Sequence, residues 1–420
     1  MTTTPTERLY YTDPYLIAFD ARVLDVRDVS GRPGLVLDRT AFYPTSGGQP
    51  FDTGMLGDDR VVEVAEREDG VIEHVVGGET GYAVGQRVHG RIDMARRFDH
   101  MQQHTGQHVL SAAFERLHGV QTESFHLGSV SSTIDLGREV APGDIAHAEF
   151  EANRIVWEDR VVSIRYASAE EAAALPLRKP PATRARESLR LIEITDFDLS
   201  ACGGTHVSRT GRIGMVAVAA WERFKRGTRV EFVCGVRALE HFRRQRDALS
   251  ASIKLLSVAP GELAEAIARA QTDSKELRRE LKRMQEKIAS ADADALFRDA
   301  PADHGVMLVA RALDGYDSAG LRSLVVTAAA ASGRVAIVCS TTRPVALAIG
   351  RSKDVPLDAG ALLRTVMDRF GGRGGGNREL AQGGGIDAAA EDVLAEAAQL
   401  VRTELQRKTK TEERIERKLD

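Results

Sequence analysis

Two short sequences decide how this chain folds: HTGQH, from His104 to His108, and CGGTH, from Cys202 to His206. Each places two metal-binding side chains four residues apart, two imidazoles in the first and a thiol with an imidazole in the second. Zinc prefers these ligands. A lone histidine is more often an ordinary surface or core residue, but two spaced pairs in one chain favour a metal site. We therefore predict that all four side chains bind one Zn²⁺ ion.

The residues around the first pair predict a helix. Residues 96–118 carry a stripe of apolar side chains at helical spacing, and Gly119 is a stop signal. Because residues four apart are neighbours on a helix, His104 and His108 face the same way. His100 lies one turn earlier on that face, so it could replace His108 as a ligand or support the site from outside the ligand set.

Length and composition indicate a soluble protein of several domains. The chain has 420 residues, enough for about two to four domains, and 28% of them are charged. The three cysteines argue against a disulfide framework, so we predict a cytoplasmic protein in which Cys234 and Cys339 are buried thiols. The polar N-terminus has no secretion signal and no apolar run is long enough to cross a bilayer, so we expect no membrane partner.

The apolar pattern predicts an α+β fold in four parts. Residues 1–95 contain short strands separated by Gly and Asp, which is typical of a small β-barrel. Residues 96–235 alternate helices with strands and contain both metal-binding sequences, so we predict a zinc-containing α+β domain. Residues 236–298 are predicted to form long helices. Residues 299–420 are predicted to form a compact α/β domain that ends in a charged helical tail.

The predicted helices of residues 236–298 have two explanations. From Leu263 to Ala295, apolar or small side chains recur at alternating steps of four and three, as in a heptad pattern. The seam also contains Ser and several Ala, so a helical hairpin that packs on itself explains it as well as an intermolecular coiled coil does. A homodimer through this helical region or the C-terminal domain is therefore one expectation.

The predicted barrel contains a stretch rich in Gly and Pro, from Phe42 to Gly54. Composition alone favours a tight turn between strands, because both residues are common in turns. The alternative is a loop whose backbone approaches another surface or a ligand, which Gly47 and Gly48 would permit.

At these residues the chain resembles the alanyl-tRNA editing proteins, which are freestanding relatives of the editing half of alanyl-tRNA synthetase. The resemblance rests on both metal-binding sequences and on GGQPFDTG from Gly47 to Gly54. It also rests on the glycine-rich segment from Gly371 to Gly385, which resembles a DHHA1-type nucleic-acid-binding domain. Together these motifs cover nearly the whole chain in the order found in the long form of the family.

The resemblance implies a zinc-dependent hydrolase that acts in trans. Its expected substrate is alanine tRNA wrongly charged with serine or glycine, and it would cleave the aminoacyl ester. The two pairs match the family's metal-binding positions. Thr122 and His126 follow the first helix, where the family places polar groups that recognise the amino acid. With Gly47, Gly48 and Gln49, they are the predicted substrate-binding residues.

A tRNA partner requires a basic surface, although the net charge is only −4. Residues 208–247 contain ten basic and four acidic side chains, so this run either binds RNA or forms an ordinary solvated face. The predicted tRNA-binding residues are Arg223, Lys225 and Arg226 in this run, with Arg373 and Arg378 in the glycine-rich segment.

Two other functions compete with ester hydrolysis. Four protein ligands are typical of a structural zinc, whereas three ligands and a water are typical of a catalytic one. The main alternative is therefore a non-catalytic tRNA-binding protein with a structural zinc. A phosphodiesterase that shares only the C-terminal domain ranks last, because the sequence lacks an Asp-His-His triplet.

Overall fold

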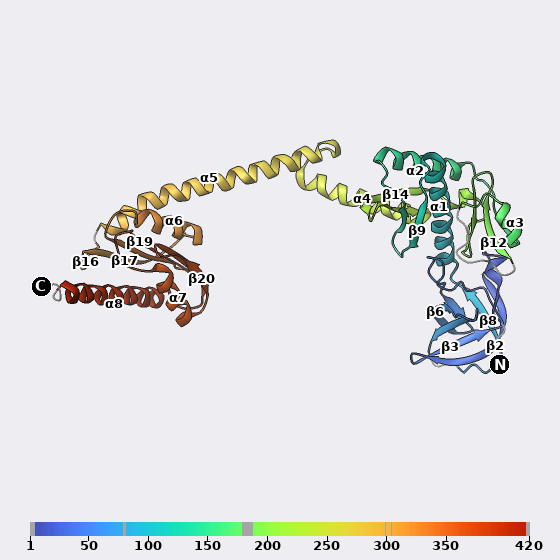
Figure 1. Cartoon of the computed structure of the whole chain (residues 1–420), viewed down its shortest axis with the longest axis horizontal. Coiled ribbons are helices and arrows are strands. Elements are labelled where there is room, and N and C mark those ends of the chain that lie inside the picture. The colour runs from blue at the N-terminus through green and yellow to red at the C-terminus, as the bar shows by residue number, and fades with distance from the viewer. Residues whose placement is uncertain (1–4, 79–80, 179–187, 299, 304, 417–420) are drawn as a thin grey trace. The chain divides into compact units, whose positions relative to one another are not determined.

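The computed structural model of the chain describes residues 5–78, 81–178, 188–298, 300–303 and 305–416. The chain divides into two compact units, Met1–Leu255 and Leu256–Asp420. Both mix helices with strands, so the predicted α+β class is confirmed (Figure 1). None of the helices in the described ranges combines the length and apolar character needed to span a bilayer.

The first unit begins with a closed barrel of six strands in the order β2-β3-β7-β6-β5-β8. In β2, Phe19, Ala21 and Val23 alternate with exposed residues and pack into the barrel core, as expected for a strand with one buried face. The predicted small barrel is therefore confirmed. The elements of this part are β1 (Glu7–Arg8), η1 (Leu9–Tyr11), β2 (Ala18–Val29), β3 (Arg32–Leu37), β4 (Arg39–Thr40), β5 (Gly54–Leu56), β6 (Asp59–Glu66), β7 (Ile72–Gly77) and β8 (Arg87–Ile92).

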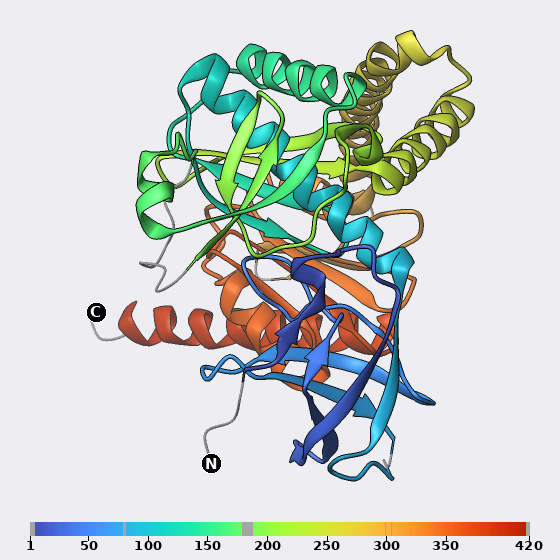
Figure 2. The same ribbon diagram turned by 90° about the vertical axis from the view of Figure 1, so that its right-hand side faces the viewer.

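Helix α1 (Met94–His118) leads from the barrel into the rest of the first unit (Figures 1 and 2). The Asp93 side chain caps its first turn, and Gly119 ends it in the left-handed conformation, with a φ of 63°. The predicted helix is confirmed, and it begins two residues earlier than expected. Most of its side chains are buried, because α2, β9 and β15 all pack against it.

A buried ion pair ties α1 to the barrel. Arg97 and Asp52 are both fully buried, and Arg97 Nε lies 3.0 Å from Asp52 Oδ1. Arg97 also donates hydrogen bonds to the backbone carbonyls of Pro14 and Ala41. Removing one member of such a pair leaves an uncompensated buried charge, which costs about 3–5 kcal/mol. Because Asp52 belongs to the Gly- and Pro-rich stretch, this ion pair holds that stretch against α1.

The remainder of the first unit contains two sheets. One has four strands in the order β14-β15-β10-β9, and the other has three in the order β11-β12-β13. The elements of this part are β9 (Thr122–Leu127), β10 (Ser132–Leu136), α2 (Pro142–Trp157), β11 (Val162–Ala167), α3 (Ala169–Ala174), β12 (Leu189–Ile194), β13 (Asp198–Ala201), η2 (Thr210–Ile213), β14 (Val216–Phe224), β15 (Gly227–Cys234) and α4 (Gly235–Leu256).

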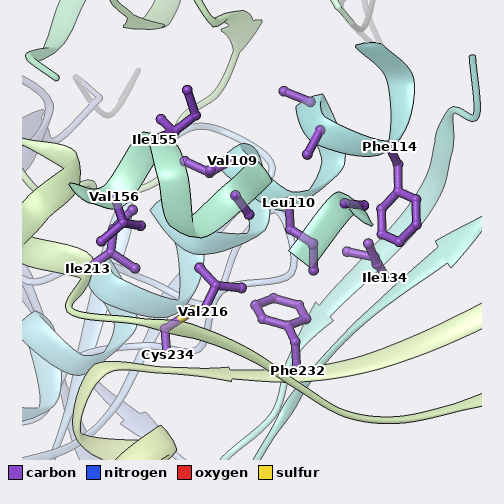
Figure 3. Close-up of a cluster of buried hydrophobic side chains, with 14 of the residues drawn as sticks. Val109, Leu110, Phe114, Ile134, Ile155, Val156, Ile213, Val216, Phe232 and Cys234 are labelled. Carbon is purple, nitrogen blue, oxygen red and sulfur yellow. The ribbon is translucent and has the colours of Figure 1, made fainter. Parts of the chain in front are cut away.

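The main core of the first unit lies between α1, α2 and the four-stranded sheet. Figure 3 shows Val109 and Leu110 of α1 among side chains of α2 and of the sheet strands, including Ile155 and Phe232. Cys234 belongs to the same core and is fully buried, and Cys339 is equally buried in the second unit. Burial raises the pKa of the Cys339 thiol to about 11. The prediction that these two cysteines are buried is therefore confirmed.

The second unit is a sheet covered on both faces by helices. Its strand order is β16-β17-β18-β19-β21-β20, and only β17 and β18 are parallel. Along β18, Val335 and Ile337 pack with α7 and α8, whereas Ala336 packs with α5 and α6 on the other face (Figure 1). Its elements are η3 (Pro260–Glu262), α5 (Leu263–Phe297), β16 (Ala302–Asp303), β17 (Val306–Leu313), α6 (Ser318–Ala328), β18 (Arg334–Ser340), β19 (Val345–Arg351), α7 (Ala359–Phe370), β20 (Arg373–Gly376), β21 (Leu380–Ile386) and α8 (Ala390–Glu416).

The glycine-rich segment of the second unit forms an antiparallel pair, β20 and β21. A Cβ atom on Gly376 would lie 2.2 Å from the carbonyl oxygen of Leu380, so only glycine allows the two strands to approach this closely.

The two long helices expected within residues 236–298 are α4 and α5. Their pairing stays a prediction, because α4 belongs to the first unit whereas α5 belongs to the second. The α5 seam residues Ile267, Leu277, Leu281 and Met284 are exposed.

Candidate metal centre

The two sequence pairs meet at one point in the first unit. One ligand atom from each of His104, His108, Cys202 and His206 lies within 4.8 Å of the other three. Cys202 Sγ is 3.4 Å from His104 Nε2 and 3.3 Å from His206 Nε2. The three histidines are buried, and Cys202 is half-buried. His100 lies outside this group.

The ligand spacing fits a zinc ion. A tetrahedral zinc with ordinary Zn–S and Zn–N bonds separates a sulfur from a nitrogen by about 3.6 Å, close to the distances found here. Burial by itself raises the pKa of the Cys202 thiol, but the imidazoles of His104 and His206 lower it well below its ordinary value. This shift favours the thiolate, which is the form that binds metals.

The local backbone explains how the second pair faces the first. Cys202 and His206 lie on the loop after β13, and Gly204 packs directly on His104. A Cβ atom on Gly204 would lie 2.2 Å from His104 Cε1. Arg190 donates hydrogen bonds to the carbonyl oxygens of Cys202 and Gly204, at 2.7 and 2.9 Å. A glycine and a buried arginine therefore fix the turn that aims the thiolate at α1.

Each histidine of the group is oriented by a partner on its other ring nitrogen. His104 Nδ1 lies 2.8 Å from Gln49 Oε1, and His108 Nδ1 lies 2.9 Å from Asp198 Oδ2. His206 Nδ1 lies 3.2 Å from Thr105 Oγ1. A metal-binding histidine usually donates its remaining N–H to such a partner, which fixes the ring.

Asp198 has the most extensive hydrogen bonding of these partners. It is fully buried, and it also accepts hydrogen bonds from Arg178 Nε at 2.6 Å and Ser200 Oγ at 3.0 Å. Burial alone raises the pKa of Asp198, but the hydrogen bonds from His108 and Arg178 lower it to about 2. The carboxylate is therefore charged at neutral pH.

The predicted substrate loop lies against the metal-binding group. Gln49 is fully buried, and besides contacting His104 it donates from Nε2 to Thr205 Oγ1 at 2.9 Å. The Gly48 carbonyl accepts a hydrogen bond from Leu127, while Gly47 is exposed with a φ of 55°. The stretch is therefore more than a turn between strands, because Gln49 connects the barrel to the loop that carries Cys202 and His206.

The other two predicted substrate residues lie on different faces of β9. Thr122 donates a hydrogen bond of 2.8 Å to Ser111 Oγ, which also accepts one of 2.9 Å from Gln107 Nε2. Gln107 Oε1 is buried and has no hydrogen-bond partner in the described part of the chain. His126 is exposed, whereas its neighbour Phe125 packs against His104 with ring centroids 5.4 Å apart.

His100 was the open alternative to His108 as a ligand. It is buried, and its Nδ1 has no partner among the described residues. Burial lowers its pKa to about 4, which keeps it neutral at physiological pH.

The predicted tRNA-binding residues are at the surface of both units. Arg223, Lys225 and Arg226 surround the turn between β14 and β15, and all three are exposed. Arg223 also lies 2.7 Å from Glu139. Arg373 and Arg378 are exposed on and beside the β20–β21 pair.

Several arginines of the basic run are bound to carboxylates instead. Arg209 pairs with Asp159, Arg229 with Asp135 and Arg237 with Asp99, each at a distance of 2.6 or 2.7 Å. Several arginines of the run are therefore paired with carboxylates, whereas Lys225 and Arg226 at the turn between β14 and β15 are exposed, as are Arg243 and Arg244 on α4.

Sequence reasoning missed Thr105, Arg178, Asp198 and the role of Gln49 in holding His104. Thr105 lies within HTGQH, so its place between the two histidines could have marked it as a residue of the site. No sequence pattern marks Asp198 as a partner of His108, because the two residues are 90 positions apart along the chain.

Three family models match the chain. They are class II (A) tRNA synthetases over residues 12–96, the threonyl and alanyl tRNA synthetase second additional domain over residues 189–231, and the DHHA1 domain over residues 305–406. The first covers most of the barrel, the second includes Cys202 and His206, and the third covers most of the sheet of the second unit, so a DHHA1 domain is present there.

Curated relatives match nearly the whole chain. The alanyl-tRNA editing protein AlaX-L of Pyrococcus horikoshii is 31% identical over 95% of this chain and 99% of its own length. Alanine–tRNA ligases of Methanoculleus marisnigri and Halobacterium salinarum are 34% and 36% identical over 92% and 94% of this chain. The chain spans only 42% and 44% of those two ligases.

Proposed function

The chain belongs to the family of alanyl-tRNA editing proteins, and on that premise we propose that it is a trans-acting deacylase of mischarged alanine tRNA. In this proposal it cleaves the ester that joins serine or glycine to the terminal adenosine of the tRNA. A Zn²⁺ ion held by His104, His108, Cys202 and His206 is its cofactor.

The observation that carries the proposal is the convergence of three oriented imidazoles and a thiolate on one point. A zinc ion bound there would polarise the ester carbonyl and lower the pKa of an attacking water. Gln49, Asp198 and Thr105 hold the three imidazoles in place, which limits the ways in which the donor set can move. Cys202 is the ligand nearest to solvent, so the substrate ester would approach from its side.

We propose that the amino acid of the substrate is recognised by a hydrogen-bonded group of Thr122, Ser111 and Gln107. Serine differs from alanine by one hydroxyl, which a pocket that works by shape alone rejects poorly during charging. A site that hydrogen-bonds this hydroxyl can select serine afterwards. The unpartnered Gln107 Oε1 and the Thr122 hydroxyl supply the polar atoms for it.

The tRNA would be bound through its phosphates. Lys225 and Arg226, at the turn between β14 and β15, lie on the unit that contains the metal centre. Arg373 and Arg378 provide a second set of cations beside exposed glycine backbone. Binding by such contacts weakens as salt is added.

We extend the proposal to location and assembly. Three free cysteines favour the cytoplasm, where thiols stay reduced. The exposed apolar seam of α5 favours a homodimer, since Leu277 and Leu281 are 65% and 60% exposed.

The test is deacylation of Ser-, Gly- and Ala-tRNA by purified protein before and after removal of metal with a chelator. We expect the metal-loaded protein to release serine or glycine and to leave Ala-tRNA intact. Chelation and Cys202→Ala should both stop the release, while tRNA binding through the second unit remains. Loss of ester at only the spontaneous rate with the metal-loaded protein would contradict the proposal.

The competing function is a tRNA-binding protein with a structural zinc. It is favoured by the donor set itself, because four protein ligands that are mostly buried are typical of structural sites. Under this alternative the chelated protein unfolds, and the metal-loaded protein binds mischarged tRNA without hydrolysing it.

A further inference from the structure

We propose that the chain binds a second divalent transition-metal ion, held by His118, Asp144 and His147. One ligand atom from each of these side chains lies within 4.8 Å of the other two. The group shares no residue with the first metal centre. The proposal therefore stands independently of the deacylase function.

The site lies where two helices meet. His118 is the last residue of α1, and Asp144 lies in the first turn of α2. His147 follows Asp144 by three residues, so the two side chains are neighbours on one face of α2. Because α1 and α2 pack against each other in the main core, the backbone on both sides of the site is held in place.

The Nδ1 atom of His118 faces the carboxylate of Asp144. It lies 3.6 Å from Asp144 Oδ1, which is longer than a hydrogen bond. A metal bound between these two atoms would use Nδ1; Nε2, which is buried without a partner among the described residues, would not contact it. A distance of 3.6 Å is close to the roughly 3.4 Å that separates two N or O ligands of a tetrahedral metal ion.

His147 brings a second imidazole to the same place. Its ring is nearly parallel to that of His118, at an interplanar angle of 11° with centroids 6.4 Å apart. Two imidazoles and one carboxylate suit Zn²⁺, Co²⁺ or Ni²⁺, whereas Mg²⁺ and Ca²⁺ prefer oxygen ligands only.

Some charges around the site would attract a metal cation and others would repel it. The carboxylate of Asp144 and the negative end of the α1 dipole attract a cation. Arg138 lies nearby, since it donates a hydrogen bond of 2.8 Å to the backbone carbonyl of His118. The metal must therefore be held by its ligands more than by the surrounding field.

A metal at this site would act as a clamp. It would join the end of α1, which carries His104 and His108, to the start of α2. The strand that begins at Thr122 follows His118 after only three residues, so the same clamp would also fix the group proposed to recognise the amino acid.

Titration of the metal-free full-length protein with Co²⁺ tests the proposal. A thiolate ligand gives Co²⁺ a charge-transfer band in the near ultraviolet, so this band reports the Cys202 site alone. We expect two equivalents to bind, with the band complete after one of them and only visible d–d absorbance added by the other. Metal analysis after gel filtration should likewise find two ions per chain.

Variants separate the two sites. His147→Ala and Asp144→Asn should each bind one equivalent, with the charge-transfer band of the Cys202 site unchanged. Cys202→Ala should lose the band and keep one equivalent. The matched control is His89→Ala, because His89 is exposed and pairs with Asp20 at 2.9 Å, and the described residues offer no third ligand there.

Three results would overturn the proposal. One is a wild-type protein that binds a single equivalent. Another is a second equivalent that binds only at millimolar metal, which would mark adventitious binding. The third is a His147→Ala protein that still binds two equivalents. A protein that binds two metals but hydrolyses no mischarged tRNA would contradict the proposed function and leave this inference intact.

Discussion

Asp198→Asn tests whether an outer carboxylate holds the metal centre together. Asp198 is fully buried and accepts hydrogen bonds from His108, Arg178 and Ser200. Asparagine keeps the size of the side chain but replaces one acceptor oxygen with an NH₂ donor. One of the three donors then faces another donor, and the charge that balances Arg178 is lost.

The size of the effect follows from these contacts. Mutation of a partner of a metal-bound histidine typically changes metal affinity or activity by about 10–100-fold. That range corresponds to about 1.4–2.7 kcal/mol. Losing a hydrogen bond to a charged group costs about 1.5–3 kcal/mol of folding stability. Because burial raises the pKa of Asp198 but His108 and Arg178 lower it to about 2, the substitution removes a real negative charge at neutral pH.

The assay is zinc competition with a chromophoric chelator, followed by deacylation at saturating zinc. We expect a zinc dissociation constant about 10–100-fold higher than that of the wild type. The matched control is Asp196→Asn, which makes the same chemical change at an exposed residue in the turn just before β13. An Asp198→Asn protein with unchanged zinc affinity and activity would refute the view that this carboxylate positions His108.

Two further predictions concern specificity and acid stability. Thr122→Val should lower the deacylation rate on Ser-tRNA about fivefold, the value of one neutral hydrogen bond, and leave the rate on Gly-tRNA unchanged; equal losses on both substrates would count against recognition of the hydroxyl. His74 is fully buried in the barrel, and burial lowers its pKa to about 4. Because an unfolded histidine takes up its proton near pH 6.5, the unfolded chain binds more protons between pH 6.5 and 4, and stability falls by up to about 3 kcal/mol as pH drops through this window. Urea unfolding at pH 7 and pH 4.5 should show a smaller loss for His74→Gln than for the wild type, and an equal loss would disprove the assignment.

Patterns that repeat along the chain predicted the fold well. The helical stripe after residue 95 predicted α1, and the alternation in the first 95 residues predicted the barrel. Both patterns arise from one buried face on a single element, so local sequence is enough to detect them.

The glycine-rich segment is a different case. Glycine is rare in strands, yet β20 and β21 form there because the two backbones pack too closely for a side chain at Gly376. That requirement comes from the neighbouring strand, which no local pattern reveals.

Local spacing along the chain was enough to predict the four donors of the candidate metal centre. A spacing of four on a helix, or across Gly203 and Gly204, brings two side chains together through local geometry alone. How those donors are oriented depends on contacts that form in the folded chain. Their partners Gln49, Asp198 and Thr105 lie 55, 90 and 101 residues away along the chain, and packing between distant elements brings them into contact.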